Sequence, residues 1–238
     1  MNSILDSYIN GNSNFHTMGP KLLSKTYNWG LPKPPKGVLL DENLSVCSQT
    51  ISLKKQLQIL WYEHPERRIE LTQFIVKEWG GIKTNSRNTL TAYAKLSANY
   101  LPQNISGVAS WSKVLGIIDP DKFAIYDARV AVSLNALQLL SKPETRYFFP
   151  YLQGRNNIVG NSTKKIGFSQ RPEFKKNGEL MKNWQRIPRN ETYTHYLELL
   201  DHASKGSGYS VYEIEMALFA DAENLAIACS QKFQVPLS

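Results

Sequence analysis

Apolar residues recur at helical spacing through most of this 238-residue chain, and the stretches end at prolines or glycines. Leu53, Leu57 and Trp61 predict a helix over residues 52–62, and Pro65 follows at its end because the residue before a proline avoids helical geometry. The same reasoning predicts a mainly α-helical, all-α protein with further helices over residues 65–79, 86–100, 113–118, 128–140, 191–203 and 211–229.

Residues 1–43 differ from the rest of the chain in composition. They are rich in Asn, Ser, Gly and Pro, and residues 31–37 read LPKPPKG. Three prolines in seven residues favour an extended backbone, so we expect an N-terminal arm followed by a helical domain over residues 44–238. Tyr27 and Trp29 give this arm two side chains that can pack against the domain.

Positive charge is concentrated in residues 142–189, which we call the basic segment. It contains eleven Lys and Arg residues against three Glu residues, so it accounts for the whole formal net charge of +8. Its glycines and prolines follow no sustained period, which predicts a long loop with one hairpin, and its seven aromatic residues predict that the loop is ordered. A basic surface of this kind favours a polyanionic partner.

Several classes of protein are excluded by what the chain lacks. The two cysteines, Cys47 and Cys229, are too few for a disulfide framework or a four-thiolate metal site, and the four histidines have no metal-ligand spacing. No apolar run approaches the roughly 20 residues that span a bilayer, and the first residues do not resemble a signal peptide. We therefore expect no metal, no cofactor, no membrane contact and a cytoplasmic location.

The glycine turn at Gly107 is a candidate phosphate site. With Ser110 or Ser112 as the N-cap, a short helix would begin there and point its free backbone N–H groups outward, which suits phosphate binding. A plain turn between two helices explains the same residues.

Asp127 lies immediately before the helix predicted over residues 128–140, where an N-cap residue belongs. A capping carboxylate is held rigidly and kept ionised, so it also suits the stabilisation of a developing positive charge. Lys113 lies one loop upstream, and Lys122 and Arg129 add positive charge at the same helix end. A structural cap alone remains the alternative interpretation of Asp127.

Residues 106–140, with Lys113, the sequence KFAIYDARVA and Asp127 within it, resemble the helix-hairpin-helix DNA glycosylases. The likeness is to the oxoguanine-glycosylase-like branch, which includes small bacterial proteins that act against phage with modified cytosines. The turn reads Gly-Val-Ala-Ser-Trp-Ser-Lys where the family has Gly-Val-Gly-x-Lys, and the spacing from Lys113 to Asp127 is about one helical turn shorter. Lys122 is therefore a second candidate for the lysine.

The resemblance implies a two-lobed helical fold with a helix-hairpin-helix at about residues 90–140, and an enzyme that flips a modified base out of double-stranded DNA. In this interpretation Lys113 attacks the sugar C1′ and Asp127 supports the cationic sugar, with abasic-site lyase activity as a second outcome. Candidate walls of the base pocket are Tyr126, Phe149, Trp184 and Tyr193. Candidate DNA contacts are Gly107, Ser110, Trp111, Ser112, Lys122, Arg129, Lys164, Lys165, Lys175 and Lys176.

Two other functions fit the same residues. The chain can be a non-catalytic DNA-binding module that uses the hairpin and the basic segment only to hold phosphates, or a scaffold whose basic segment binds an acidic protein. In each case we expect a monomer. A modified base, for example a glucosylated cytosine, is the substrate we expect if the protein is an enzyme.

Overall fold

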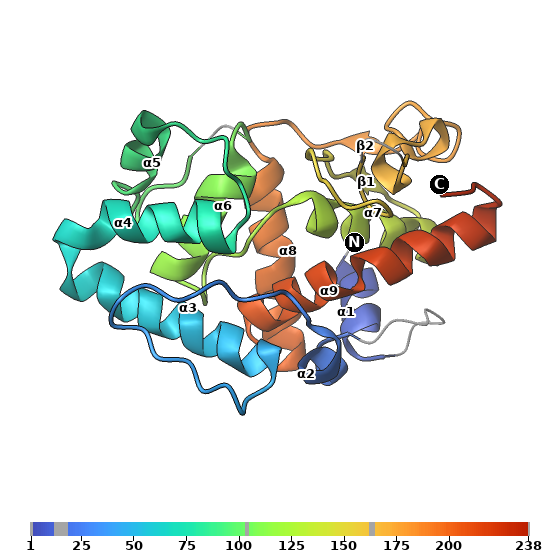
Figure 1. Cartoon of the computed structure of the whole chain (residues 1–238). Helices are drawn as coiled ribbons and strands as arrows, with labels where there is room; N and C mark the ends of the chain where they lie inside the picture. The colour runs from blue at the N-terminus through green and yellow to red at the C-terminus, as the bar shows by residue number, and fades with distance from the viewer. Residues whose placement is uncertain (1, 12–18, 103–104, 162–164, 238) are drawn as a thin grey trace.

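Helices dominate the computed structural model, which describes residues 2–11, 19–102, 105–161 and 165–237 (Figure 1). The mainly α-helical class predicted from the sequence is therefore confirmed. No helix among the described residues has the length and apolar character needed to cross a membrane. The α-helices are α1 (Asn2–Ile9), α2 (Leu23–Thr26), α3 (Val46–Glu63), α4 (Arg68–Gln73), α5 (Arg87–Tyr93), α6 (Val108–Ile118), α7 (Ala128–Ser141), α8 (Thr192–Ser207) and α9 (Val211–Phe233).

The helix predicted over residues 65–79 consists of three consecutive pieces. A 3₁₀ turn η2 (Pro65–Arg67) leads into α4, which continues as a π-helix η3 (Phe74–Trp79). The amide of Gly80 donates to the carbonyl of Ile75, five residues back, at 3.0 Å. Such π turns are rare and are often found at functional sites.

Two other predicted helices have different bounds. The helix expected over residues 86–100 ends at Tyr93, because the amides of Lys95 and Leu96 bond only three residues back and tighten the chain into a turn. The helix expected at Lys113 begins earlier, at Val108, where Gly107 adopts a left-handed φ of 72°. The expected N-caps Ser110 and Ser112 are wrong, since both lie inside α6.

The expected extended arm over residues 1–43 is also wrong in its first part. It contains α1, a 3₁₀ turn η1 (Pro20–Leu22) and α2, and the side chains of Ile4, Leu5 and Tyr8 are buried in the core. The hydroxyl of Tyr8 donates to the buried carboxylate of Asp221 in α9 at 2.7 Å. The arm therefore belongs to the same core as the helical domain, because the short apolar run ILDSYI packs against α8 and α7.

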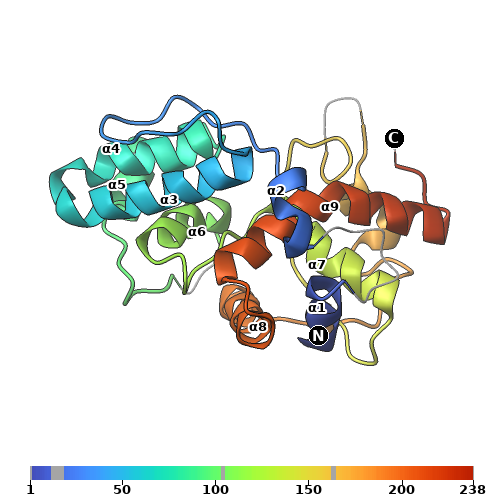
Figure 2. The same cartoon turned by 90° about the horizontal axis from the view of Figure 1, so that it is seen from below.

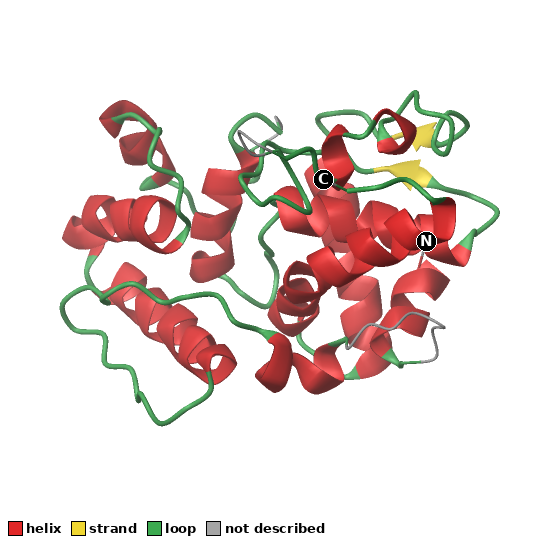
Figure 3. Cartoon of the chain, turned by 45° about the vertical axis from the view of Figure 1, so that its right-hand side comes forward, coloured by secondary structure: helices red, strands yellow, loops and turns green. Residues whose placement is uncertain are grey.

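The described residues of the basic segment, 142–161 and 165–189, are folded, as the aromatic content predicted, and Asn161 and Ile166 form an isolated antiparallel bridge. Strands β1 (Tyr147–Phe148) and β2 (Gln185–Arg186) pair in parallel, with 3₁₀ turns η4 (Phe168–Gln170) and η5 (Pro172–Phe174) between them. The rings of Phe168 and Phe174 stack at a centroid distance of 4.1 Å and are fully buried. The two strands lie beside α7 in Figure 1 and are the yellow arrows of Figure 3, and loops of the segment cover this side of the domain.

Helix α7 is buried over most of its length, from Val130 to Leu139, and α9 packs along it. Its first turn is joined to α9, because the guanidinium of Arg129 pairs with Glu223 and donates to the carbonyl of Phe219. Figures 1 and 2 both show α3, α4 and α5 on one side of the molecule and α7 and α9 on the other. Helix α6 ends near α3, and the loop from α6 to α7 crosses between the two groups.

Candidate functional site

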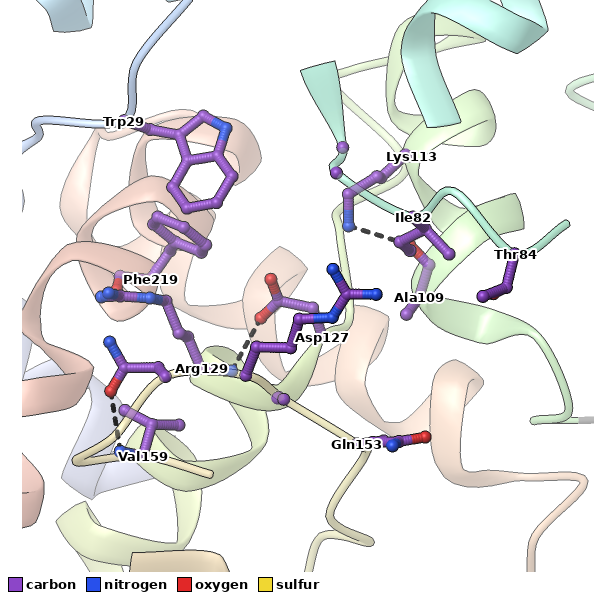
Figure 4. A pocket seen from close by; sticks show the side chains of 16 residues that line it. Trp29, Ile82, Thr84, Ala109, Lys113, Asp127, Arg129, Gln153, Val159 and Phe219 are labelled. Atoms are coloured by element: carbon purple, nitrogen blue, oxygen red, sulfur yellow. Dashed lines mark hydrogen bonds between the residues drawn. The ribbon is translucent and has the colours of Figure 1, made fainter. Parts of the chain in front are cut away.

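A cavity of about 470 Å³ opens where α6, the start of α7, α9, the N-terminal arm and the basic segment come together (Figure 4). The side chains of Lys113 and Asp127 both line it, and Figure 4 shows them extending toward the same space. The full lining is Trp29, Gly80, Gly81, Ile82, Thr84, Ala109, Lys113, Asp127, Ala128, Arg129, Gln153, Gly154, Arg155, Asn156, Val159 and Phe219.

Asp127 is the N-cap of α7, as its sequence position predicted. Its Oδ1 accepts hydrogen bonds from the amides of Arg129 at 2.9 Å and Val130 at 3.1 Å. The preceding residue is also anchored, since the amide of Tyr126 donates to Ser112 Oγ at 3.2 Å. The two capping bonds therefore hold the carboxylate in a fixed position at the cavity wall, at the positive end of the α7 dipole.

Lys113 is a buried amine, with only 7% of its surface exposed. Its Nζ donates to the carbonyl of Ala109, one turn back in α6, at 2.8 Å. Burial lowers the pKa of Lys113, and nearby Lys54 acts in the same direction, whereas Asp127 and Glu215 raise it. The net lowering increases the fraction of neutral amine, which is the form that can act as a nucleophile.

A buried ion pair lies close enough to Lys113 to affect that pKa. Lys54 Nζ of α3 contacts Glu215 Oε2 of α9 at 3.0 Å, and the two side chains are 5% and 3% exposed. Burial raises the pKa of Glu215, and Lys54 opposes that rise. The sequence analysis did not identify this pair, because its partners are 161 residues apart and each lies on an ordinary helix face.

The hairpin turn is only partly placed for phosphate binding. Gly107 is exposed, but Ser110, Trp111 and Ser112 are buried. The hydroxyl of Ser110 accepts from Asn85 at 2.8 Å, and the indole N–H of Trp111 donates to the carbonyl of Ser106 at 3.0 Å. These three side chains face the protein interior, so the expectation that they contact DNA is wrong.

Lys122 lies away from the cavity. Its Nζ donates to the carbonyl of Ala98 at 3.0 Å, and it lines a second hollow with Asp121 and Glu198. Lys122 and Asp127 therefore line different hollows, which favours Lys113 over Lys122 as the candidate nucleophile. Arg129, by contrast, lines the main cavity, where its guanidinium pairs with Glu223 and lies 4.9 Å from the centre of the Phe219 ring.

The four aromatic residues expected to wall a base pocket do not line the cavity. Tyr126, Phe149, Trp184 and Tyr193 are all buried, and the hydroxyls of Tyr126 and Tyr193 donate to the carbonyls of Pro150 and Ala124. Tyr126 and Tyr193 hold the loop between α6 and α7 against the core, and Phe149 and Trp184 are core residues, as single aromatic residues usually are.

Trp29 and Phe219 are the aromatic residues that do line the cavity. Their rings meet edge to face at a centroid distance of 5.3 Å and an angle of 89° (Figure 4). Trp29 was identified in the sequence only as a packing residue of the arm, and Phe219 carried no signal beyond its place in an apolar helix. Only the packing of the arm onto α9 brings the two rings to one place.

The basic segment reaches the cavity through Gln153, Arg155 and Asn156. Of the four lysines expected to contact DNA, Lys165 and Lys175 are exposed and Lys176 is half-buried, whereas Lys164 lies outside the described residues. Lys165, Lys175 and Lys176 therefore present positive charge on the same segment that borders the cavity.

Comparison of the chain with protein-family models, with curated proteins and with solved structures found no match.

Proposed function

We propose that this protein is a DNA glycosylase that accepts an extruded base in the cavity and breaks its N-glycosidic bond. The observation that carries the proposal is the shared position of a buried amine and a capped carboxylate in one cavity with two aromatic rings. A nucleophile of lowered pKa beside a fixed negative charge is the combination that this reaction requires.

The chemistry assigns one role to each group. The neutral amine of Lys113 attacks the sugar C1′, and the base leaves with the electron pair of the C1′–N bond and takes up a proton. The attacking nitrogen then loses a proton and the C1′–O4′ bond breaks, so that O4′ keeps the electron pair and takes up a proton while nitrogen and C1′ form a protonated imine. Water hydrolyses this imine to an abasic site and free lysine. Asp127 stabilises the positive charge that develops on the sugar. Loss of a proton from the sugar C2′ of the protonated imine would instead break the C3′–O bond and expel the 3′ phosphate with its electron pair, which is lyase activity.

Trp29 and Phe219 form the platform for the base in this proposal. Aromatic rings stack on an extruded base, and such stacking contributes about 1–3 kcal/mol per base in single-stranded complexes. Gln153 and Asn156 place amide groups at the same cavity, where they can hydrogen-bond the edge of a base. A modified cytosine is the substrate class that we propose, and the basic segment supplies the contacts to the DNA backbone.

A non-catalytic DNA-binding module is the second candidate, and one observation favours it. Asp127 already accepts two backbone hydrogen bonds, and the Lys113 amine already donates to Ala109. Both groups are thus accounted for by the protein alone. This candidate predicts DNA binding without release of any base.

Borohydride trapping separates the two candidates. The protein is incubated with duplexes that carry cytosine, 5-methylcytosine, 5-hydroxymethylcytosine, its glucosylated form, 8-oxoguanine or a single abasic site, and released bases are measured by mass spectrometry. We expect free base from a modified duplex and, after reduction, a covalent adduct that Lys113→Gln abolishes and Lys122→Gln retains. Binding without base release or adduct on every duplex would support the binding module.

A further inference from the structure

The π-helix η3 ends at the cavity, and Gly80, the residue after it, packs against Lys113. A Cβ at Gly80 would lie only 2.7 Å from Cδ of the Lys113 side chain. The aliphatic part of Lys113 therefore crosses the space that a side chain at position 80 would fill, and its amine lies beyond this crossing, on the carbonyl of Ala109. The absence of a side chain at Gly80 is what admits Lys113 in this conformation.

Trp79, the last residue of η3, contacts the other wall of the cavity. Its carbonyl accepts a hydrogen bond from the indole N–H of Trp29 at 3.1 Å. Trp29 meets Phe219 edge to face, so this bond sets the angle of the ring that completes the aromatic platform. Two adjacent residues thus contact both the amine side and the aromatic side of the site.

The π turn explains why two adjacent residues, Trp79 and Gly80, contact Trp29 on one wall of the cavity and Lys113 on the other. A π turn holds one more residue than an α turn, and one residue corresponds to about 100° of rotation around a helix. If residues 74–79 were α-helical, the Trp79 carbonyl and the Gly80 Cα would point in different directions and would not meet Trp29 and Lys113.

We propose that the C-terminal end of η3 is a positioning element of the active site, in which Gly80 admits and aligns Lys113 and the Trp79 carbonyl aligns Trp29. The inference rests on the proposed glycosylase function, since it concerns the same nucleophile and the same platform. Neither residue takes part in the bond changes.

Gly80→Ala tests the alignment of Lys113. The probe is a duplex with a single abasic site, and the readout is the rate of borohydride-trapped adduct at saturating DNA, with the Kd measured separately. We expect the rate to fall about 100-fold, as displacement of a reacting group by about 1 Å can cause, with the Kd within about threefold of wild type. Gly206→Ala is the matched control, because a Cβ there meets nothing within 4 Å. A wild-type rate in folded Gly80→Ala overturns the alignment of Lys113.

Trp29→Phe tests the second contact and remains informative if Gly80→Ala does not fold, because a Cβ at Gly80 would also lie 2.8 Å from the carbonyls of Ile75 and Val76. The variant keeps an aromatic ring but removes the N–H that bonds the Trp79 carbonyl. We expect base release from the panel duplex that wild type processes best to fall at least about tenfold, and to fall more than trapping on the abasic duplex. Equal effects on both readouts, or a wild-type rate of base release, overturn the proposal.

The wild-type protein separates failure of this inference from failure of the proposed function. If wild type forms neither adduct nor free base on any duplex of the panel, the glycosylase function fails and the positioning role fails with it. If wild type is active and both variants match it, only the positioning role fails.

Discussion

Asp127 combines a structural role with a proposed chemical one. Its carboxylate caps α7 through two amides, and the same contacts hold the negative charge at the wall of the cavity. No other side chain is needed to fix the rotamer of a capping residue, because the backbone N–H groups at the start of the helix bind its side chain.

Asp127→Asn separates the two roles. The amide oxygen can still cap α7, but the charge that would stabilise a cationic sugar is lost, so we expect base release to fall by about 100-fold or more while the Kd for DNA is unchanged or lower. Asp119→Asn is the control, since Asp119 caps a turn of the same loop through Lys122 and does not line the cavity. Retention of base release within a few fold in Asp127→Asn would show that Asp127 is only a cap.

The pKa of Lys113 predicts how adduct formation depends on pH. Burial lowers this pKa, so the neutral amine becomes the main form at a lower pH than for an ordinary lysine with a pKa of 10.5. We expect the rate of adduct formation on abasic DNA to rise as pH increases through the lowered pKa and then to level off. Measurement of trapping between about pH 5 and about pH 10 tests this, and Lys122→Gln should show the same profile. A rate that falls steadily over the range would contradict a lysine nucleophile.

At the scale of elements, a buried ion pair joins α3 to α9. The two helices come from opposite sides of the molecule in Figure 1, and the pair of Lys54 with Glu215 is a direct polar contact between them. A buried charge is tolerated only when it is paired, because desolvation of a lone ion costs several kcal/mol.

Lys54→Met should therefore destabilise the protein by about 3–5 kcal/mol, since it leaves Glu215 buried without its partner. The double variant Lys54→Met with Glu215→Met should recover most of this loss, because it removes both charges. Chemical denaturation monitored by circular dichroism measures the free energy of unfolding of each variant. The exposed pair Lys205 with Asp201 is the comparison, and Lys205→Met should change stability little. Equal stability of the single and double variants would show that the pair is not coupled.

For the molecule as a whole, the basic segment carries the net charge and borders the cavity. This arrangement places the positive surface where a DNA backbone would pass if one of its nucleotides entered the cavity. On a face remote from the cavity, the same positive charge would attract DNA without bringing a nucleotide to the cavity.

Neutralising four lysines of the basic segment should flatten the salt dependence of DNA binding. With Lys164, Lys165, Lys175 and Lys176 all replaced by Gln, the slope of log K against log salt should decrease in magnitude by roughly 0.9 for each lysine that contacts a phosphate. Titrations of a duplex between about 50 and 200 mM salt measure the slope. The control replaces Lys21, Lys25 and Lys205, which are exposed and lie outside the segment. An unchanged slope in the fourfold variant would remove these lysines from the interface.

Local patterns in the sequence were sufficient to predict the helical class and the cap at Asp127. Three signals depend only on residues within a few helical turns: the helical spacing of apolar residues, the glycines and prolines at helix ends, and the capping of α7. The π turn was not predictable in this way. An α turn and a π turn over residues 74–79 differ by one residue in their hydrogen bonding, and the apolar pattern is compatible with both.

The sequence by itself determined the candidate residues and the charged stretch: Lys113, Asp127 and the basic segment are all recognisable as candidates from residue type and position. Only the tertiary structure decided which aromatic side chains line the cavity. Tyr126 and Tyr193 are turned into the core, whereas Trp29 and Phe219, which are 190 positions apart in the chain, meet because the N-terminal arm packs on α9. Burial and contact between distant segments depend on how helices pack, and a single chain read residue by residue contains no local signal for that packing.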